Sequence, residues 1–331
     1  MPILVTGAAG FIGYHVSEAL LARGEHVVGV DNLSPYYDVA LKQARLERLE
    51  SKRGFKFIRA DIGDRQAFGD ALSAVSGIDQ VVHLAAQAGV RYSLDHPFVY
   101  AETNVVGHLV ILEYCRALKN LRHLVYASSS SVYGANSELP FSVEDRVDRP
   151  VSLYAATKRT NELMSRSYAH LYGLPQTGLR FFTVYGPWGR PDMAIYIFTK
   201  AILAGQPIHL FNGGDMRRDF TFIDDIVQGV LAALDRPPEG TPPHRLYNLG
   251  NSRVEPLTRV VELIEGLLGK KAKVINEPMQ PGDVKETCAD IAASERDLGF
   301  APTTPLDVGL PKFIEWYRAH VEKKAQVESQ A

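Results

Sequence analysis

The sequence feature that most constrains the fold is a glycine-rich turn near the N-terminus, Thr6-Gly7-Ala8-Ala9-Gly10-Phe11-Ile12-Gly13. An apolar run at residues 3–5 predicts a buried strand before it, and residues 11–23 have the period of a helix. Glycine is required where a backbone turns sharply, approaches a pyrophosphate closely and packs a helix against a strand. The free N–H groups at the start of the following helix favour phosphate. The turn therefore predicts a nucleotide-binding α/β protein.

The rest of the first half repeats this alternation of strands and helices. Mostly apolar strands are expected at residues 26–30, 56–59, 80–84, 123–127 and 176–182. Helices are expected between them at residues 39–49, 65–75 and 99–118. The pattern is typical of a Rossmann-type α/β fold, a doubly wound parallel sheet with helices on both faces.

A loop rich in proline and glycine at residues 185–191 marks the expected domain boundary. We expect residues 1–185 to form the Rossmann domain, with segments around residues 218–250 returning to it. Residues 186–331 are expected to form mainly a smaller C-terminal α/β domain that binds the substrate. The elements predicted there are helices at residues 193–203, 256–268 and 305–320 and strands at residues 205–211 and 274–277.

Composition argues against several other classes of protein. The 331 residues carry 36 basic and 38 acidic side chains, so a basic face for nucleic acid is not expected. Cys115 and Cys288 are too few for a disulfide framework, and the ten histidines have no ligand spacing, so no metal is predicted. No apolar run reaches membrane-spanning length, and the chain opens directly into a strand. We expect a cytoplasmic protein with no membrane partner.

The ends of the predicted strands supply candidate contacts for a dinucleotide. Asp31, followed by Asn32, closes the second strand. A carboxylate there can bond both hydroxyls of an adenosine ribose and repels a 2′-phosphate, which favours NAD over NADP. Asp61-Ile62 closes the third strand and can meet the adenine, although Asp61 can equally cap the next helix. Leu84-Ala85-Ala86-Gln87 closes the fourth strand with mostly small residues, which permit close approach of a cofactor.

A tyrosine and a lysine four residues apart, Tyr154 and Lys158, share one face of a predicted helix that Ser152 can cap. A phenol with a pKa near 10 is a poor base at neutral pH, but a nearby ammonium and a positive nicotinamide ring favour the phenolate. Tyr154 can then take a proton from a substrate hydroxyl while hydride passes to NAD, and Lys158 can bond the nicotinamide ribose. The spacing alone often marks a surface pair, so the serines at residues 128–131 just upstream matter to the hypothesis.

The glycine turn, Asp31, residues 128–134 and the Tyr154/Lys158 pair resemble the extended short-chain dehydrogenase/reductases that act on nucleotide sugars. The resemblance implies NAD as cofactor, a UDP-sugar as substrate, and Ser129 as the catalytic serine, with Ser130 and Ser131 as alternatives. It also implies a homodimer formed through two helices of each chain. Apolar residues on more than one face of the predicted helices at residues 99–118 and 152–172 agree with such an interface.

Three further segments, at residues 32–38, 87–93 and 183–193, resemble those of UDP-glucuronate 4-epimerases within this family. That resemblance implies inversion of C4 through a 4-keto sugar, giving UDP-galacturonate, with Thr183 against the sugar. Arg91 and Arg190 are expected at the carboxyl edge of the sheet. Either can grip the substrate carboxylate, join a structural ion pair or bind the diphosphate. By the same resemblance, Arg218 is the phosphate-binding arginine and Asp283 bonds the uridine ribose.

Two absences distinguish related reactions. The residues between the catalytic tyrosine and lysine, Ala155-Ala156-Thr157, include no carboxyl group, whereas decarboxylating relatives carry one there. Ser130-Ser131 stand where dehydrating relatives place an acidic pair. We therefore expect the carboxylate to be retained and no water to be lost. The rival hypotheses are epimerisation of another UDP-hexose or an N-acetylhexosamine, decarboxylation of UDP-glucuronate, and a non-catalytic NAD-binding sensor or scaffold.

Overall fold

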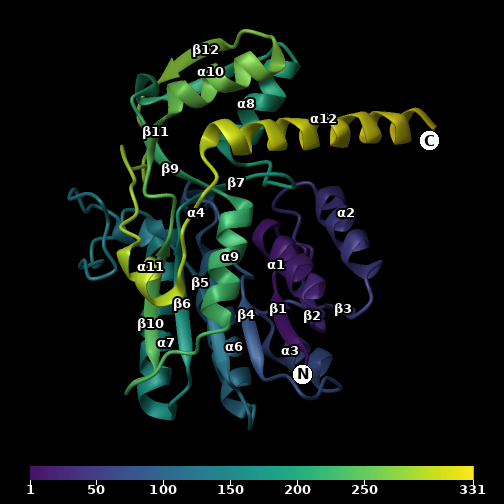
Figure 1. Cartoon of the computed structure of the whole chain (residues 1–331), viewed down its shortest axis with the longest axis vertical. Coiled ribbons are helices and arrows are strands. Elements are labelled where there is room, and N and C mark those ends of the chain that lie inside the picture. The colour runs from purple at the N-terminus through teal and green to yellow at the C-terminus, as the bar shows by residue number, and fades with distance from the viewer. Residues whose placement is uncertain (331) are drawn as a thin grey trace.

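The computed structural model describes the backbone of residues 1–330 and the side chains of residues 1–320, and its centre is a parallel sheet of seven strands (Figure 1). The spatial order of the strands is β10-β6-β5-β4-β1-β2-β3. Their bounds are β1 (Ile3–Thr6), β2 (Val27–Asp31), β3 (Phe55–Arg59), β4 (Gln80–His83), β5 (His123–Ser129), β6 (Gln176–Phe181) and β10 (His244–Leu249). The order reverses between β1 and β4, and such a reversal leaves a crevice at the carboxyl ends of the strands. The Rossmann-type fold predicted from the sequence is confirmed.

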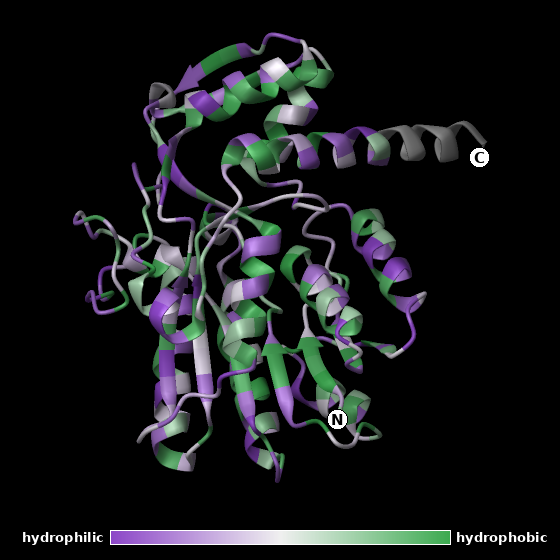
Figure 2. Cartoon of the chain, in the orientation of Figure 1, coloured by the Kyte–Doolittle hydropathy of each residue, from purple (hydrophilic) through white to green (hydrophobic). Residues whose placement is uncertain are grey.

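Helices cover both faces of this sheet because the strands at its centre are buried along their length, and green stretches mark their apolar residues in Figure 2. One core contains Val16 and Leu20 of α1 together with Ile226 and Val230 of α9. The core on the opposite face contains Ile111 of α6. The helices that cover the sheet are α1 (Phe11–Ala22), α2 (Val39–Glu50), α3 (Arg65–Leu72), α6 (Gly107–Ala117), α7 (Leu153–Tyr172) and α9 (Ile223–Leu234).

The helix expected at residues 99–118 is interrupted in the structure. Two short helices, α4 (Tyr92–Asp95) and α5 (Pro97–Tyr100), precede a π-helical turn, η1 (Ala101–Val106), and α6 follows it. Inside the turn, the carbonyl of buried Asn104 accepts a hydrogen bond from Asn161 Nδ2 of α7 at 2.6 Å. The Asn104 side chain meanwhile bonds the backbone of Gln87, at 2.8 and 3.0 Å. These tertiary bonds replace part of the regular helical ladder, and that is the setting in which π-turns occur.

The second half builds a smaller lobe above the carboxyl ends of the strands (Figure 1). A three-stranded sheet of β11, β9 and β7 joins this lobe to the main sheet, and β12 pairs in parallel with β8. The strands are β7 (Thr183–Tyr185), β8 (Pro207–Phe211), β9 (Arg217–Phe222), β11 (Val254–Pro256) and β12 (Lys273–Glu277). The helices are α8 (Ala194–Leu203), α10 (Leu257–Leu268), α11 (Ala292–Leu298) and α12 (Leu306–Gln330), and single turns η2 (Ser130–Tyr133) and η3 (Asn212–Gly214) complete the elements.

Two elements of the second half belong to the main sheet. Strand β10 pairs in parallel with β6, and helix α9 packs against α1. Strand β9, by contrast, pairs with β7 and β11 in the small sheet. The return of the chain that we expected around residues 218–250 therefore starts at α9, while the division at residue 185 stays a prediction.

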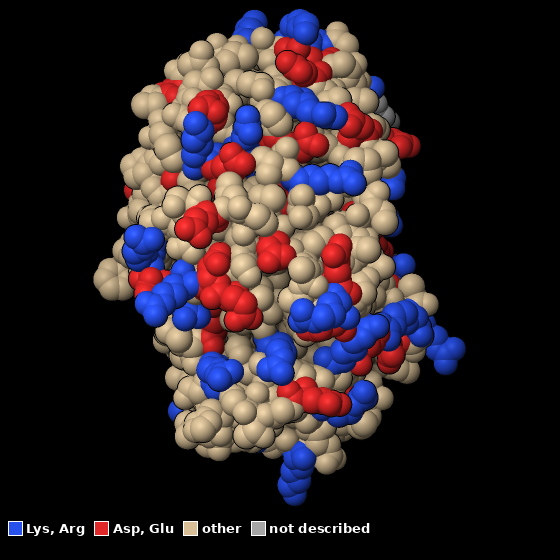
Figure 3. All heavy atoms as spheres, turned by 60° about the vertical axis from the view of Figure 1, so that its left-hand side comes forward, with Lys and Arg blue, Asp and Glu red and all other residues tan. Residues whose placement is uncertain are grey.

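The charged side chains are mixed in sign on the face seen in Figure 3, where no broad area of one sign appears. Within the described residues, no helix combines the length and hydropathy needed to cross a lipid bilayer. The described residues also contain no group of three or more His, Cys, Asp or Glu side chains placed to hold a metal ion.

Candidate active site

One cavity of about 1960 Å³ opens along the carboxyl edge of the main sheet and continues beneath the smaller lobe. It exceeds the roughly 300–1,000 Å³ of an ordinary small-molecule site, so two nucleotide-sized ligands can share it. Every site residue predicted from the sequence lines it. These residues are Gly7, Gly10, Phe11, Ile12, Gly13, Asp31, Asn32, Asp61, Ile62, Leu84, Ala85, Ala86, Gln87, Arg91, Ser129, Tyr154, Lys158, Thr183, Arg190, Arg218 and Asp283.

The glycine turn leaves no space for side chains. Gly7 has φ +73°, and a Cβ placed on it would lie 2.7 Å from the backbone nitrogen of Ala85 in the loop after β4. A Cβ on Gly13 would lie 2.0 Å from the Gly7 carbonyl oxygen. The first turn of α1 contains no acidic side chain that would oppose an anion. The turn thus brings free N–H groups to the cavity wall, which is the environment that a pyrophosphate requires.

Asp31 is held rigidly at the carboxyl end of β2. One carboxylate oxygen accepts a hydrogen bond from Ala9 N of the glycine turn at 3.1 Å, and the other accepts one from Leu33 N at 2.8 Å. Each oxygen keeps a lone pair for a further donor, such as a ribose hydroxyl. Asp31 and the glycine turn together therefore fit the adenosine half of a dinucleotide.

Asp61 lies at the same end of the cavity and bonds its own turn. Its carboxylate accepts hydrogen bonds from Gly63 N at 2.7 Å and from Asn32 Nδ2 at 2.9 Å. The N-cap of α3 is Asp64, which accepts from Ala67 N at 2.9 Å. Of the two interpretations of Asp61 from sequence, the helix cap is wrong, since Asp64 fills that position.

Tyr154 lies near the start of α7, where Ser152 caps the helix by accepting a hydrogen bond from Ala155 N at 3.1 Å. Burial raises the pKa of the Tyr154 phenol, and a hydrogen bond with Ser129 and the charge of Arg190 only partly oppose this. The protein alone therefore holds Tyr154 as a protonated phenol.

Lys158 is buried one helical turn below Tyr154. Its ammonium donates to the Ala127 carbonyl of β5 at 3.0 Å, and burial lowers its pKa to about 8. Near neutral pH it therefore keeps its charge at the place where β5 ends. An ammonium held there can donate to a ribose hydroxyl and stabilise a phenolate on Tyr154.

The four consecutive serines are separated by the alternation of side chains along β5. Ser128 donates its hydroxyl to Glu162 Oε1 at 2.7 Å, so it is committed to the buried side of α7. Ser129 points the other way, bonds Tyr154 and accepts from Ser131 N at 3.2 Å. Ser130 and Ser131 begin η2 and also line the cavity. The geometry thus favours Ser129 as the partner of the phenol.

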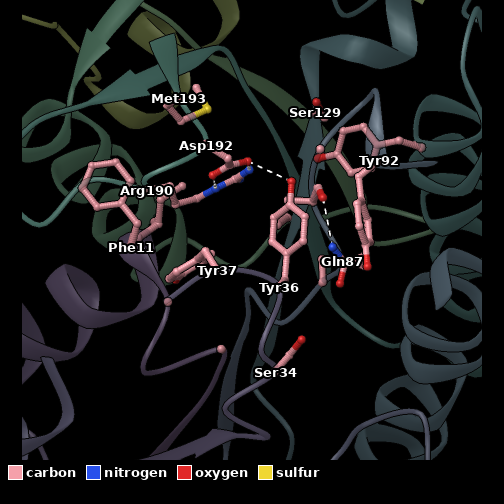
Figure 4. Close-up of a pocket in the computed structure, with 18 of the residues that line it drawn as sticks. Phe11, Ser34, Tyr36, Tyr37, Gln87, Tyr92, Ser129, Arg190, Asp192 and Met193 are labelled. Carbon is pink, nitrogen blue, oxygen red and sulfur yellow. Dashed lines mark hydrogen bonds and ion pairs between the residues drawn. The ribbon is translucent and has the colours of Figure 1, made fainter. Parts of the chain in front are cut away.

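Arg190 supplies a positive charge that lowers the pKa of Tyr154. Its Nε donates to Asp192 Oδ1 at 3.0 Å, and Tyr36 O–H donates to the other Asp192 oxygen, also at 3.0 Å (Figure 4). Burial alone would raise the pKa of Asp192, but the Arg190 guanidinium outweighs it and lowers that pKa. The guanidinium is therefore charged, oriented and paired before any ligand arrives.

Arg91, Arg218 and Asp283 gather at the other end of the cavity. Arg91 Nη2 bonds Asp283 Oδ2 at 2.8 Å, and its guanidinium lies 4.0 Å from the centre of the Phe211 ring. Arg218 donates to the Lys285 carbonyl at 3.0 Å, and burial lowers its pKa, an effect that Asp283 opposes. This cluster is built like a site for the diphosphate and ribose of a nucleotide.

A buried ion pair behind the serines was missed by the sequence reasoning. Arg180 of β6 bonds Glu162 of α7 through two hydrogen bonds, of 2.8 and 3.0 Å, and both side chains are 1% exposed. Its signal was available: Tyr154, Lys158 and Glu162 follow one another at a spacing of four, and Arg180 is a charge inside an apolar strand. The pair fixes Ser128 and hence the strand end that carries Ser129.

Arg45 of α2 was missed as well. Its fully buried guanidinium donates to the Ala9 carbonyl of the glycine turn at 2.9 Å and to the Trp188 carbonyl at 2.6 Å. It also donates to the Tyr37 hydroxyl at 2.8 Å. Arg45 therefore joins the glycine turn to the loop that presents Arg190, a contact between distant segments that no local sequence pattern reveals.

The fold and this cavity together define a nucleotide-binding oxidoreductase-type site. Residues 3–250 match the NAD dependent epimerase/dehydratase family, and the chain belongs to that family. Among its relatives, UDP-glucuronate 4-epimerase 4 of Arabidopsis thaliana is 48% identical over 339 residues, which cover 98% of this chain and 77% of the relative. Protein CapI of Staphylococcus aureus is 47% identical over 340 residues, covering 98% of this chain and all of CapI.

The chain is also similar to a solved structure of a UDP-glucuronic acid 4-epimerase. UDP-glucuronic acid 4-epimerase from Bacillus cereus, in complex with UDP-glucuronic acid and NAD, has a TM-score of 0.89 and 36% identity, covering 96% of this chain and 99% of the other. A UDP-glucose 4-epimerase from Thermotoga maritima, solved with UDP-glucose, has a TM-score of 0.87 and 31% identity, covering 97% and 100%.

Proposed function

We propose that this protein is an NAD-dependent isomerase that inverts C4 of UDP-glucuronate to give UDP-galacturonate. The observation that carries the proposal is a single cavity in which Ser129, Tyr154 and Lys158 lie with Arg190, between a dinucleotide turn and a nucleotide-binding cluster. The similarity to UDP-glucuronate 4-epimerases over nearly the whole chain supports the same substrate.

The cofactor half of the cavity fits NAD. The glycine turn receives the pyrophosphate, Asp31 accepts from the adenosine ribose, and Asp61 and Ile62 lie at the adenine end. When bound, NAD supplies a hydride acceptor and donor at its nicotinamide ring, so the sugar can be oxidised and reduced again at one carbon. Lys158 is placed to hold the nicotinamide ribose beside Tyr154.

Tyr154 performs the proton transfer at the C4 hydroxyl. Burial raises the pKa of the phenol, and a positive nicotinamide ring bound beside Tyr154 would lower that pKa toward the phenolate. The phenolate then accepts the proton of the C4 hydroxyl, and Ser129 bonds that C4 oxygen. After the 4-keto sugar has rotated within the site to present its opposite face, Tyr154 returns the proton. Proton and hydride are both returned, so neither cofactor nor solvent is consumed.

Arg190 is the residue that we propose for the substrate carboxylate. It lies on the Tyr154 side of the cavity, close enough to influence the pKa of that phenol, and Thr183 lies in the same wall. Arg91 is bound to Asp283 and to the Phe211 ring, so we assign it to the nucleotide end with Arg218. A bidentate guanidinium fixes the plane of a carboxylate.

We propose that the fixed carboxylate also prevents loss of carbon dioxide. The 4-keto sugar is a β-keto acid, which loses carbon dioxide when its breaking bond aligns with the carbonyl π system. Arg190 can hold the carboxylate away from that alignment. The stretch between Tyr154 and Lys158 supplies no acid either: Thr157 donates its hydroxyl to the Tyr154 carbonyl at 2.8 Å and accepts from Asn104 at 3.1 Å.

We further propose a homodimer that works in the cytoplasm. Helices α6 and α7 lie against each other and expose apolar side chains, including Leu163, which is 54% exposed, and Leu171, which is 62% exposed. A second copy would cover these side chains by a twofold contact. Replacing Leu163 by glutamate is expected to give monomers in light scattering. The two unpaired cysteines suit a reducing compartment.

The experiment that tests the function is incubation of the purified protein with UDP-glucuronate and chromatographic separation of the products. We expect UDP-galacturonate and no UDP-pentose. Turnover of UDP-glucose or a UDP-N-acetylhexosamine in place of UDP-glucuronate would refute the substrate assignment. Formation of a UDP-pentose would refute retention of the carboxylate, and absence of any turnover with bound NAD would favour a sensor.

A further inference from the structure

The guanidinium of Arg190 is held along one edge. Asp192 accepts from Arg190 Nε at 3.0 Å and from Nη2 at 2.5 Å, so its carboxylate covers the side of the guanidinium. Among the described residues Nη1 makes no hydrogen bond, and the Arg190 side chain is 23% exposed in the cavity. A guanidinium can bind a further carboxylate in bidentate fashion through Nη1 and Nη2. The pair with Asp192 therefore leaves the end of Arg190 available to a ligand.

Tyr36 fixes the Asp192 carboxylate in turn. Its O–H donates to Asp192 Oδ2 at 3.0 Å, and Figure 4 shows this hydroxyl pointing at Asp192. The centre of its ring lies 4.8 Å from that of Tyr92, and a Cβ on Gly89 would collide with the Tyr36 hydroxyl. Burial raises the pKa of the Tyr36 phenol, so it stays a donor at neutral pH. Tyr36 thus holds Asp192, and Asp192 holds Arg190.

The chain Tyr36–Asp192–Arg190, which we call the brace, ends beside the catalytic phenol. Arg190 lowers the pKa of Tyr154 and Asp192 raises it, so both charges act on that group. In the proposed reaction Tyr154 acts at C4 of the sugar, and the C6 carboxylate is attached to the neighbouring carbon, C5. A carboxylate so close to C4 is an anion that the free end of Arg190 can receive.

We propose that Asp192 and Tyr36 are positioning residues that set the orientation of the Arg190 guanidinium and thereby decide whether the 4-keto sugar keeps or loses its carboxylate. This inference rests on the proposed function, because it takes UDP-glucuronate as the substrate. A carboxylate bound bidentately takes its position from the guanidinium, so a fixed Arg190 keeps C6 near the plane of the C4 carbonyl. A guanidinium that can move lets C6 leave that plane, and the C5–C6 bond then aligns with the carbonyl π system.

Loss of carbon dioxide is the reaction that the brace suppresses. The C5–C6 bond breaks, carbon dioxide leaves, and the bonding electron pair forms an enolate over C5, C4 and the C4 oxygen. Protonation of C5 from solvent gives a 4-keto pentose, and the hydride first removed from C4 then returns to C4. The products are carbon dioxide and a UDP-pentose, with no net oxidation or reduction of the cofactor. Both outcomes start from the same keto sugar, so their ratio reports how well its carboxylate is held.

The test measures the ratio of UDP-pentose to UDP-galacturonate that purified holoenzymes form from UDP-glucuronate. Asp192→Asn keeps the shape of the side chain but removes its charge and one of its two acceptor oxygens. From the usual strength of hydrogen bonds to charged groups, we expect the ratio to rise about 10- to 100-fold in Asp192→Asn and about 3- to 10-fold in Tyr36→Phe. Tyr247→Phe is the matched control, because it removes a tyrosine–aspartate hydrogen bond, 3.2 Å to Asp297, outside the cavity. It should leave the ratio at the wild-type value.

Steady-state kinetics separate positioning from simple obstruction. Arg190 keeps its charge in both variants, so KM for UDP-glucuronate should stay within about threefold of wild type while the product ratio changes. If Asp192 only blocks Arg190, Asp192→Asn would lower KM and leave the ratio unchanged, and this result would overturn the inference. In the double variant Tyr36→Phe/Asp192→Asn the ratio should equal that of Asp192→Asn, because Tyr36 acts through Asp192. A rise equal to the product of the two single effects would contradict the inference.

Tyr36→Phe removes a single oxygen atom, so it tests the inference even if Asp192→Asn does not fold. An unchanged ratio in Tyr36→Phe would overturn the inference in that case. If the wild type forms no UDP-galacturonate from UDP-glucuronate, the proposed function fails. If the wild type forms it and the folded variants give no more UDP-pentose than wild type does, only this inference fails.

Discussion

Removal of the Glu162 charge should destabilise the protein more than removal of any surface ion pair. Glu162 accepts two hydrogen bonds from Arg180, one from Ser128 at 2.7 Å and one from Arg159 at 2.9 Å. In Glu162→Met, the Arg180 guanidinium is 1% exposed, and the partners left to it among the described residues are the Tyr133 hydroxyl oxygen, which accepts at 3.0 Å, and the Tyr133 ring. Loss of one partner of a buried pair costs about 3–5 kcal/mol.

The expected loss converts into a measurable melting shift. With 331 residues and about 2.1 cal/mol/K per residue, the unfolding entropy is about 0.7 kcal/mol/K. The Glu162→Met variant should therefore melt about 4–7 °C below wild type in a calorimetric scan. The matched control is Arg159→Met, whose side chain is 30% exposed and whose loss should cost about 1 kcal/mol or less.

The double variant Glu162→Met/Arg180→Met separates the stranded charge from simple loss of packing. With both charges gone, at least about 2 kcal/mol of the Glu162→Met loss should be recovered. A loss of stability in the double variant that equals the sum of the losses in Glu162→Met and Arg180→Met would refute the reasoning. A loss below about 1 kcal/mol in Glu162→Met would refute it as well. Because Arg180 holds the pKa of Glu162 below its ordinary value despite burial, this stabilisation is present above the unfolded pKa near 4.5 and is lost as pH falls through the lower, folded pKa.

Three further predictions concern the turn, the carboxylate and acid stability. Gly13→Ala should abolish NAD retention, because the new Cβ would lie 2.0 Å from a carbonyl oxygen. Gly69→Ala is the control: the space around its Cβ is open, so this variant should retain NAD fully. Measurement of bound NAD after gel filtration tests both variants. Arg190→Met should lower kcat/KM for UDP-glucuronate by about 10- to 100-fold, and an equal loss with UDP-glucose would remove its role at the carboxylate. Burial lowers the pKa of His83 to about 3, so the unfolded chain, with a pKa near 6.5, binds a proton at this histidine before the folded protein does. As pH drops below 6.5, this group should lower the free energy of unfolding by at most about 1.4 kcal/mol per pH unit. Urea unfolding at several pH values should show that this contribution to the slope is lost in His83→Gln.

The main sheet was predictable because its strands are short, apolar and separated by helices of regular period. The interrupted helix at residues 92–117 was not, since the π-helical turn depends on the bonds of Asn104 to Gln87 and Asn161, which are distant in sequence. Strand β10 was also not predicted as a strand, although it extends the main sheet beside β6. Local period indicates the elements, but it does not reveal long-range hydrogen bonds.

Site residues were predictable where a characteristic residue comes directly after a predicted strand. They were less predictable where the role of a residue depends on which side chain it contacts in the fold. Arg91 and Arg190 could not be distinguished by sequence, because both follow strands. The fold separates them by placing Asp283 beside the first and Asp192 beside the second.

The most direct test of the central claim follows the hydrogen at C4. UDP-glucuronate labelled with deuterium at C4 should give UDP-galacturonate that keeps the label at C4, because the same hydrogen leaves and returns within the site. Tyr154→Phe should still hold NAD and sugar nucleotide but lose about 10²- to 10⁴-fold in turnover. Product in which the label has exchanged with solvent would contradict the account, as would full turnover without the phenol.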